Sequence, residues 1–468
     1  MRGKHTVEKI GGSSMSRFKE IMDNLIIGRL KPNECYNRIF VVSAYGGITN
    51  LLLEHKKNGA HGVYSYFADG DERWEKALDE VREKMVSINH SFKDIGLDLN
   101  RADDFINERV DGIKNCLRDL IKIRSYGHLA PDNYLPPSRE FLSAIGEAHS
   151  TFNSTLILQA HGVNAVFVDL TGWKETKTYP INETIRQAFS KINMETELPI
   201  VTGYTKCSEG MMTHFDRGYS EITFSKVSVI TGAREGIIHK EFHLCTGDPI
   251  LIGADKVKII GNTNFDIADQ LADMGMEAIH SSASKEMELR DIPIRVKNAF
   301  EPMHPGTLIN RDYVSPIPKV DMICGRDDIL AIEVFDSNMV GEVGYDYKLV
   351  KALADNGISY IAKNTNANTI THYIEEKEKN IDRAIHEIKT TFPKADVSAH
   401  KLAIVSVMGT NMAFPGFMAR ATSALAEAGV NILAVDQCLR QVNMQFIVKR
   451  DKFKEAQLAL HKKLVEEM

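Results

Sequence analysis

Short, nearly continuous apolar runs alternate with amphipathic stretches through the first two thirds of the chain. The apolar runs, which are rich in β-branched residues, lie at residues 38–44, 165–171, 198–204, 257–260 and 292–298. Runs of this kind are typical of strands buried on both faces, as in a parallel sheet between two layers of helices. Residues 71–88 and 263–276 have the periodicity of helices. The alternation therefore predicts an α/β fold whose mostly parallel sheet is sandwiched by helices.

Residues 52–137 interrupt this alternation with a mostly charged stretch of helical period. We interpret this stretch as a helical insertion that covers one edge of the sheet. Residues 301–319 are rich in turn-forming residues, which predicts a linker between domains. The chain is thus expected to have a first domain at residues 1–300 and a second region at residues 320–468.

The second region contains an internal repeat. The order strand, helix, strand, strand, helix, strand occurs twice, and the copies correspond at ADNGISYI and AEAGVNIL. In each copy a helix ends at a glycine and a β-rich run follows. The pattern predicts two ferredoxin-like βαββαβ units, one at about residues 329–393 and the other formed by residues 320–328 and 394–468.

The composition narrows the class of protein. The 468 residues are 43% hydrophobic and 26% charged, and the net charge of −6 gives no general attraction for nucleic acid or anionic membranes. Six scattered cysteines without a CxxC pair are typical of a reducing cytosol rather than a disulfide framework or a zinc site. The N-terminus lacks the apolar segment of a signal peptide, and no apolar run approaches the roughly 18 residues that span a bilayer. We therefore expect a cytoplasmic protein without nucleic-acid or membrane partners.

Two glycine-rich turns follow predicted strands near the N-terminus. The first contains Lys9, Gly11, Gly12 and Ser13, and the second contains Ser43, Gly46, Gly47 and Thr49. Glycines let backbone N–H groups approach a phosphate closely, and a lysine neutralises phosphoryl charge. The spacing is not that of a P-loop. Each turn alone resembles an ordinary strand-to-helix connection, but two such turns at strand ends of one open sheet favour an anion-binding site.

Two further segments carry candidate binding groups. Glu147 lies among small and apolar residues of a predicted helix, where a carboxylate either reaches the surface or pairs with a substrate ammonium. Arg217, Ser220 and Glu221 surround a glycine before another predicted helix. An arginine there can bind a carboxylate bidentately, whereas the alternative is a capped surface helix.

One pair of histidines has the spacing of a helical metal site. His239 and His243 lie at i and i+4, but the sequence HKEFH is not HExxH and offers no third ligand. We therefore expect no metal held by this pair.

Together these segments resemble the aspartate kinase family of the amino-acid-kinase fold. VEKIGGSSM is similar to the family's opening K-F-G-G-[ST]-S-[VM], and VVSAYGGITN is similar to V-V-S-A-x-x-G-x-T-[ND]. The G-E pair of the family's helix falls on Gly146 and Glu147. VTGYTKCSEG and THFDRGYSEIT resemble V-T-G-F-x-G and T-L-G-R-G-G-S-D-Y-T, and CTGDP resembles the T-T-D-P turn. The resemblance covers essentially the whole chain, and the repeat at its end corresponds to a pair of ACT regulatory units.

The resemblance implies transfer of the γ-phosphoryl group of MgATP to the β-carboxylate of L-aspartate by a catalytic domain at residues 1–300. This reaction is the first step of aspartate-family amino acid or ectoine biosynthesis, and its cofactors are ATP and Mg²⁺. The implied catalytic residues are Lys9, Arg217 and Glu221. Glu147 would face the ammonium of aspartate and Arg217 a carboxylate, and the implied aspartate site is Ser43, Thr49, Glu147, Arg217 and Ser220. The implied ATP site is Lys9, Gly11, Gly12, Ser13, Gly46, Gly47, His239, Lys240 and Asp248.

The chain departs from the family pattern in the nucleotide region. Glu221 replaces the family's aspartate, and His239 and Lys240 replace a T-D pair. Ile250 replaces an arginine and Glu277 a lysine. With EKIGGSSM, DRGYSEITF, IIHKEFHL and RVKNAFEPMHPGTLI, these changes resemble the aspartate kinases encoded with ectoine biosynthesis genes.

The ACT pair implies a homodimer or larger homo-oligomer and an amino-acid effector. The aspartate that helps to hold lysine in lysine-inhibited members falls on Ile361, so we expect weak or no inhibition by lysine alone. The main alternative function is a non-catalytic amino-acid sensor with a degenerate kinase domain. The altered nucleotide loop favours that alternative, and the retained Lys9, Glu147 and Arg217 oppose it. Another enzyme of this fold, such as a glutamate or carbamate kinase, is disfavoured by the ACT pair and the RGYSE segment.

Overall fold

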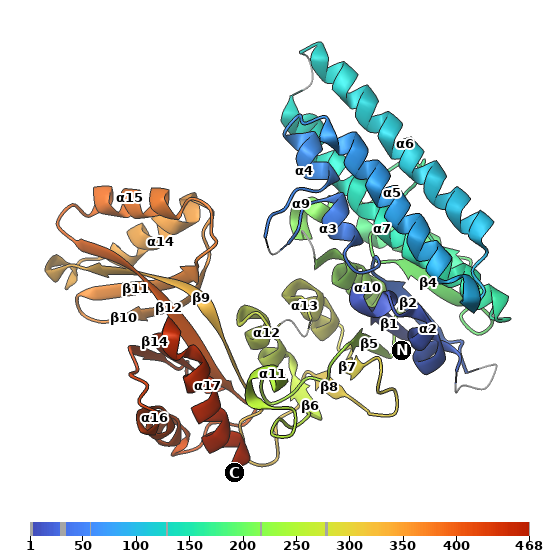
Figure 1. Cartoon of the computed structure of the whole chain (residues 1–468). Helices are drawn as coiled ribbons and strands as arrows, with labels where there is room; N and C mark the ends of the chain where they lie inside the picture. The colour runs from blue at the N-terminus through green and yellow to red at the C-terminus, as the bar shows by residue number, and fades with distance from the viewer. Residues whose placement is uncertain are drawn as a thin grey trace. The chain divides into compact units, whose positions relative to one another are not determined.

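The computed structural model describes residues 3–28, 34–56, 58–127, 130–215, 218–276 and 279–467. The chain forms two compact units (Figure 1). The N-terminal unit comprises Met1–His243 and Ile279–Arg311, and the C-terminal unit comprises Leu244–Ala278 and Asp312–Met468. No helix among the described residues is both long and apolar enough to cross a membrane.

A mostly parallel sheet forms the centre of the N-terminal unit. Its strands are β1 (Thr6–Ile10), β2 (Arg38–Val42), β3 (Ala165–Val168), β4 (Leu198–Thr202), β5 (Glu235–Lys240), β7 (Ile294–Asn298) and β8 (Thr307–Asn310). They run in the order β3-β4-β2-β1-β5-β7-β8, and neighbours are parallel except β7 and β8. The predicted α/β fold class is therefore confirmed.

Two details of the strand prediction are corrected. Residues 257–260, predicted as a strand, form only an isolated bridge between Ile259 and Cys245. This run is short and contains Lys258, so it offers little apolar surface for burial on two faces. Conversely, β5 lies in the centre of the sheet between β1 and β7, although its sequence EGIIHK carries charged residues and was not predicted as a strand.

Long helices lie beside the sheet. α5 (Arg73–Ser91) and α6 (Leu99–Ser125) form a hairpin that packs on α7 (Pro131–Ala160) (Figure 1). α7 begins with a proline at its first turn, where the missing N–H has no intrahelical partner to lose. Its buried segment is rich in Ser and Thr, whose hydroxyls bond to carbonyls of the preceding turn. The shorter helices of this unit are α1 (Gly12–Met15), α2 (Phe18–Ile21), α3 (Ile48–Leu52), α4 (Val63–Ala68), α8 (Ile181–Phe189), α9 (Met211–Phe215), α10 (Tyr219–Thr231) and α13 (Ser281–Leu289).

The C-terminal unit contains an antiparallel sheet in the order β10-β11-β9-β12-β14-β13. The strands are β9 (Met322–Phe335), β10 (Tyr360–Thr365), β11 (Thr369–Glu375), β12 (Asp396–Met408), β13 (Ala434–Asp436) and β14 (Asn443–Lys449). The helices that pack on them are α14 (Tyr345–Asp355), α15 (Ile381–Thr391), α16 (Phe417–Glu427) and α17 (Phe453–His461). β9 and β12 pair along their length and serve both predicted βαββαβ units. The unit also contains α11 (Pro249–Ile252), β6 (Asn262–Asn264) and α12 (Phe265–Asp273).

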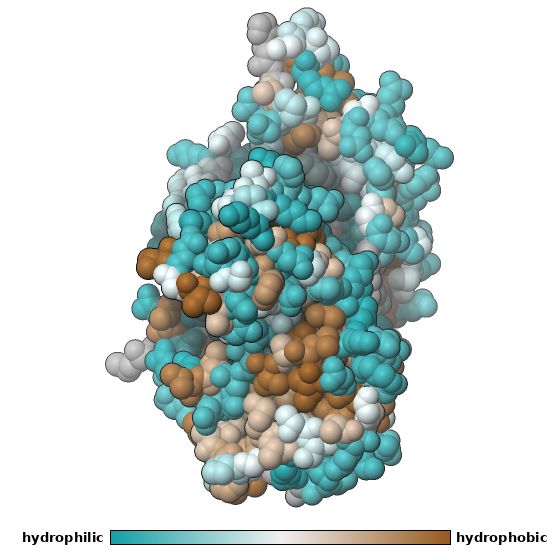
Figure 2. Space-filling view, turned by 90° about the vertical axis from the view of Figure 1, so that its left-hand side faces the viewer, coloured by the Kyte–Doolittle hydropathy of each residue, from teal (hydrophilic) through white to brown (hydrophobic). Residues whose placement is uncertain are grey.

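The C-terminal unit has two hydrophobic cores, and several of its large apolar residues are exposed. One core joins β9 and β11 to α14 and α15, and the other joins β12 and β14 to α16 and α17. Figure 2 shows hydrophobic patches between hydrophilic residues on the face turned to the viewer. The exposed large apolar residues of this unit include Val340, Val343, Tyr347, Phe414 and Leu439.

Candidate active site

Polar groups of the N-terminal unit gather where its central strands end. β4, β2, β1 and β5 are parallel neighbours, so their carboxyl ends lie at one edge of the sheet. The amide of Ser43, just after β2, donates to the carbonyl of Ile10 at the end of β1. The amide of Gly203, just after β4, donates to the carbonyl of Val42. The loops after β1, β2 and β4 are thereby held together, as the two glycine-rich turns predict.

Lys9 and Glu221 form an ion pair at this edge. Lys9 Nζ lies 3.4 Å from Glu221 Oε1, and each side chain is 12% exposed. The other oxygen, Oε2, accepts a hydrogen bond of 2.5 Å from the backbone amide of His280. Burial raises the pKa of Glu221, but the charges of Lys9 and Lys240 outweigh it and hold the pKa below its usual range. Glu221 therefore remains ionised and holds the Lys9 ammonium in place.

Glu147 on α7 is a buried carboxylate with incomplete hydrogen bonding. Its Oε1 accepts a hydrogen bond of 2.6 Å from the hydroxyl of Ser220, whose oxygen in turn accepts from Ser43 at 3.2 Å. Its Oε2 is buried and has no hydrogen-bond partner among the described residues. Burial raises the pKa of Glu147 to about 8, although Ser220, Lys9 and the nearby backbone amides of Ala44 and Tyr204 act in the opposite direction. A carboxylate in this state has room for one more donor or cation.

Two glycines make this arrangement sterically feasible. A Cβ on Gly12 would lie 2.6 Å from the carbonyl oxygen of Ala44, so only glycine lets the first two loops touch. A Cβ on Gly203 would lie 2.9 Å from both Glu147 Oε2 and Ser220 Oγ. Glycine at position 203 therefore leaves the space beside the unpartnered oxygen of Glu147 open.

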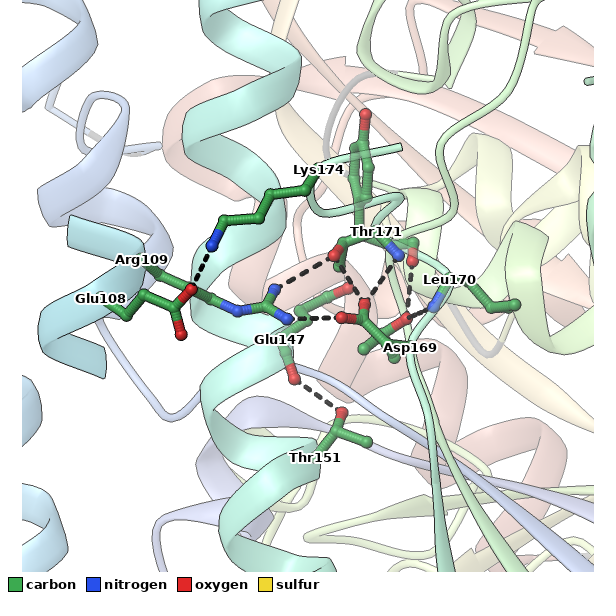
Figure 3. A network of polar contacts seen from close by, with 10 residues as sticks. Glu108, Arg109, Glu147, Thr151, Asp169, Leu170, Thr171 and Lys174 are labelled. Carbon is green, nitrogen blue, oxygen red and sulfur yellow. Dashed lines mark hydrogen bonds and ion pairs between the residues drawn. The ribbon is translucent and has the colours of Figure 1, made fainter. Parts of the chain in front are cut away.

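A polar network connects the helical hairpin to the loop after β3 (Figure 3). The guanidinium of Arg109 on α6 donates to Asp169 at 2.5 Å and to the hydroxyl of Thr171 at 3.1 Å. The amide of Leu170 donates to Thr202 at the end of β4. Figure 3 also shows Glu147 on the neighbouring helix, where its carbonyl accepts from Thr151. The network fixes the loop after β3 to the helical hairpin and to the end of β4.

The structure brings together only some of the predicted site residues. Lys9 pairs with Glu221, and hydrogen bonds join Ser43, Ser220 and Glu147. The two groups are close enough for the charge of Lys9 to lower the pKa of Glu147. Lys240 acts on Glu221 from the end of β5. Gly11 directly precedes α1, Gly12 and Ser13 lie in α1, Gly46 and Gly47 lie in the turn before α3, and Thr49 lies on α3.

Other predicted residues lie elsewhere. The side chain of His239 points to the opposite face of the sheet from Lys9, where its Nε2 donates to Glu8 at 2.8 Å. Asp248 belongs to the C-terminal unit, where its carboxylate caps α11 by accepting from the amide of Ile250. Arg217 and Glu277 lie outside the described residues.

Three residues of the site were not predicted. His280 contributes its backbone amide rather than its side chain, so its residue type carries no signal. Gly203 follows a strand, as the other site glycines do, and that pattern could have identified it. Glu140 accepts from the hydroxyl of Tyr204 at 2.6 Å and from the amide of Met212 at 2.7 Å. Both Glu140 and Tyr204 line a pocket of about 750 Å³ beside α7.

Comparisons with known proteins agree with this geometry. Residues 4–298 match the amino acid kinase family, and residues 405–464 match an ACT domain. The chain is 49% identical to the aspartate kinase Ask_Ect of Stutzerimonas stutzeri, over 99% of this chain and 98% of that protein. It is 25% identical to the chloroplastic aspartokinase 1 of Arabidopsis thaliana, over 99% of this chain and 81% of that protein.

A solved structure supports the fold. The structure of E. coli aspartokinase III in complex with aspartate and ADP aligns with a TM-score of 0.75 at 20% identity, covering 98% of this chain and all of that one. At this identity the likeness concerns the fold alone. The family assignment rests on the match over residues 4–298 and on the full-length identity to Ask_Ect, which also confirms the resemblance to the ectoine-associated subgroup. The chain belongs to the amino acid kinase family and, within it, to the aspartate kinases.

Proposed function

We propose that this protein transfers the γ-phosphoryl group of ATP to the β-carboxylate of L-aspartate and releases ADP and 4-phospho-L-aspartate. In the reaction an oxygen of the β-carboxylate forms a bond to the γ-phosphorus, and the bond from that phosphorus to the β,γ-bridging oxygen breaks. The β-carboxylate is ionised at neutral pH, so the attack requires no strong general base. Positioning and neutralisation of charge are then the main tasks of the protein.

The unpartnered oxygen of Glu147 carries the proposal. A buried carboxylate with one empty acceptor position suits the ammonium of an amino acid, which supplies both a positive charge and donors. Ser220 fixes the other oxygen, so the acceptor is already oriented before aspartate arrives. The binding of an ammonium would lower the raised pKa of Glu147 and favour its ionised form.

Lys9 is suited to the transferring phosphoryl group. Its ammonium is held by Glu221 at the edge of the sheet where β1 ends. Gly11 and Gly12 follow it, and the amides of such a turn are suited to phosphate oxygens. A fixed cation at this position stabilises the charge that moves to the leaving oxygen. Arg217, as the partner of a substrate carboxylate, remains part of this proposal on the strength of the family motif alone.

Mg²⁺ would bind at this site together with the nucleotide rather than to a separate set of protein ligands. Among the described residues no three His, Cys, Asp or Glu side chains are grouped as a metal site. Mg²⁺ is commonly bound through substrate phosphates and water with few protein ligands, and there it would neutralise phosphate charge. The residues of this chain would then bind the nucleotide and orient aspartate.

The C-terminal unit is suited to assembly and regulation. Its antiparallel sheet and paired βαββαβ units, together with its exposed apolar residues, support a homodimer or larger homo-oligomer. The ectoine-associated relative supports a role in ectoine or aspartate-family synthesis. The sequence pattern predicts a catalytic domain at residues 1–300, a linker at 301–319 and a regulatory region at 320–468. The compact units divide differently, because residues 244–278 belong to the C-terminal unit and Thr307–Asn310 form β8 of the N-terminal sheet.

A product assay tests this function. The protein is incubated with MgATP and L-aspartate, and hydroxylamine traps the acyl phosphate as a hydroxamate while a coupled assay follows ADP. We expect both signals to depend on aspartate and to be absent with L-glutamate. ADP release without hydroxamate, or no turnover by a folded protein, would favour the alternative of a non-catalytic sensor.

A further inference from the structure

α7 carries a second carboxylate that the proposed phosphoryl transfer does not use. Glu140 lies about two helical turns before Glu147, so the two side chains leave α7 on the same side. Its Oε2 accepts a hydrogen bond of 2.6 Å from the hydroxyl of Tyr204. Its Oε1 accepts from the amide of Met212 at 2.7 Å and from the amide of Thr213 at 3.3 Å. Unlike Glu147, Glu140 therefore uses both of its oxygens to hold other parts of the chain.

The hydrogen bond between Tyr204 and Glu140 is shielded from water. Tyr204 is buried and Glu140 is half-buried. Burial and the charge of Glu140 raise the pKa of Tyr204 far above its usual range. The hydroxyl therefore keeps its proton and donates to Glu140 throughout the neutral pH range. A hydrogen bond to an ionised carboxylate is stronger than one between neutral groups, and removal of one partner leaves the other unsatisfied.

The backbone of the loop after β4 borders the unpartnered oxygen of Glu147. The amide of Tyr204 is close enough to Glu147 to lower its pKa. On the side of the sheet, the hydroxyl of Thr202 donates to the carbonyl of Tyr204 at 2.9 Å. On the side of α7, the loop is held by the side chain of Tyr204 through Glu140. The position of the Tyr204 amide beside Glu147 therefore depends on a contact made two turns away along α7.

Glu140 and Tyr204 also contact the segment that supplies Ser220. The amides that donate to Glu140 belong to α9, which precedes this segment in the chain. The ring of Tyr204 packs edge to face against the ring of Tyr219, the residue before Ser220, with ring centroids 5.8 Å apart. Ser220 in turn donates to the other oxygen of Glu147. The pair of Glu140 and Tyr204 thus supports the groups on both sides of the Glu147 carboxylate.

We propose that Glu140 and Tyr204 are positioning residues for the amino-acid substrate. Glu140 acts through Tyr204 and α9 to keep the Tyr204 amide and the Ser220 hydroxyl in fixed places around Glu147. The carboxylate of Glu147 is then already oriented when the ammonium of aspartate arrives, and less binding energy is lost in ordering the site. This inference rests on the proposed kinase activity and adds one requirement to it. The affinity for aspartate depends on a hydrogen bond that the substrate itself does not touch.

Removal of the Tyr204 hydroxyl tests the first half of this arrangement. In Tyr204→Phe, KM for aspartate should rise about tenfold, because the loop beside Glu147 loses its anchor on α7. The value of kcat should change less than about threefold and KM for ATP should stay the same, since the anchor supports only the groups around Glu147. The hydroxamate and ADP assays measure these constants. Calorimetric titration of aspartate into the full chain should show the same loss of affinity without turnover.

A graded series at Glu140 tests the second half. Glutamine has a single acceptor oxygen, so Glu140→Gln can accept from Tyr204 or from the amides of α9 but not from both. KM for aspartate should therefore increase from wild type to Glu140→Gln and again to Glu140→Ala. The double variant Glu140→Ala with Tyr204→Phe should match Glu140→Ala alone, because the hydroxyl has already lost its acceptor. Effects of the two single variants that multiply would show that the residues act independently and would overturn the inference.

Tyr345→Phe is the matched control for a purely structural role. The buried hydroxyl of Tyr345 donates to the carboxylate of Asp336 at 2.9 Å, within the C-terminal unit. Both phenylalanine variants should lower the melting temperature to a similar extent, whereas only Tyr204→Phe should change KM for aspartate. If both variants change KM alike, the Tyr204 hydroxyl contributes to stability and does not position the substrate.

Failure of this inference is distinguishable from failure of the proposed function. A wild-type protein that phosphorylates aspartate, with KM unchanged in Tyr204→Phe and Glu140→Ala, would overturn the inference alone. A folded wild-type protein that neither binds nor phosphorylates aspartate would overturn both.

Discussion

Glu8 and Glu147 are both buried carboxylates of the N-terminal unit, but their surroundings differ. Glu8 on β1 accepts from Arg38 Nε at 2.6 Å and from Arg38 Nη2 at 2.8 Å. It also accepts from His239 at 2.8 Å and from the hydroxyl of Thr6 at 2.9 Å. Burial raises the pKa of Glu8, but Arg38 and His239 outweigh it and bring the pKa far below its usual range.

Among the described residues, Glu147 has one side-chain donor, Ser220, and its pKa is about 8. The comparison shows that burial alone does not indicate what a carboxylate does. A carboxylate with a full set of donors, such as Glu8, stabilises the packing of adjacent strands. A carboxylate that keeps an empty acceptor position, such as Glu147, is arranged for a ligand. The following variants test this distinction.

The largest expected effect is on stability, at Glu8. Glu8→Gln should lower the free energy of unfolding by about 3 kcal/mol, because the variant leaves the partly buried charge of Arg38 without its partner. Urea denaturation measures the change. Glu20→Gln breaks the exposed pair with Arg17 and should change the free energy of unfolding much less than Glu8→Gln. Equal effects of the two variants would show that the Glu8 network adds no stability.

Lys9 should affect turnover rather than folding. Lys9→Ala should reduce kcat about 10²-fold or more, with a smaller change in KM for aspartate, because its charge acts where phosphoryl charge is redistributed. Steady-state kinetics with the coupled assay measures both constants. Lys19→Ala, on the exposed side of α2, is the matched control and should leave kcat and KM unchanged. Near-normal turnover of a folded Lys9→Ala protein would refute the role.

Glu147 should affect the binding of aspartate. Glu147→Gln keeps the shape and the contact with Ser220 but removes the charge, so KM for aspartate should rise roughly 10- to 100-fold. Glu183→Gln, on the surface helix α8, provides the control. An unchanged KM would mean that the ammonium of aspartate binds elsewhere.

The pH dependence of stability should distinguish the two carboxylates by sign. The pKa of Glu147 is raised from 4.5 to about 8, so between these values the folded protein binds more protons there than the unfolded chain does. The contribution of Glu147 to the free energy of unfolding therefore decreases as the pH rises across this window. Glu147→Gln should remove at least about 1 kcal/mol of that decrease. Glu8 has a lowered pKa, so its contribution is lost as pH falls below its usual value. Urea denaturation of the ligand-free proteins at pH 5 and pH 8 measures the difference; parallel profiles for wild type and Glu147→Gln would contradict it.

The smallest expected effect is the response to lysine. Ile361 lies on β10, where the family's lysine-inhibited members have an aspartate, and an apolar side chain cannot pair with an ammonium. Millimolar lysine alone should therefore inhibit weakly or not at all in the ADP assay. Potent inhibition would show that another carboxylate takes that place. Ile361→Asp is the informative variant, since a gain of inhibition would locate the effector site.

The sequence predicted the main features of the fold because most strands carry a clear signal. The runs at 38–44 and 198–204 are almost wholly apolar and became β2 and β4. β5 was not predicted because it carries charged residues, which are unusual for a strand in the centre of a sheet. Such residues are tolerated there only where other side chains pair with them. His239 has such a partner in Glu8, and that pairing depends on contacts between distant segments.

The candidate site was predictable where residue type and motif coincide. Lys9, Glu147 and Ser220 occupy motif positions and lie in one cluster. The direction of His239 was not predictable, because a shift of one residue in the register of β5 against β1 would move it to the other face. The part played by His280 was not predictable either, since any residue type could offer a backbone amide to Glu221.

The long strands β9 and β12 have a consequence for how such chains can be recombined. Both strands pass through both βαββαβ units, with an irregularity in their pairing between Leu402 and Ile404. A chimera that grafts only residues 329–393 from a relative would have to splice β9 inside the sheet and keep its register against β12. An exchange of residues 312–467 as a block needs no junction within a strand of that sheet. Successful crossovers between relatives should therefore fall outside β9 and β12, and the two units should be inherited together.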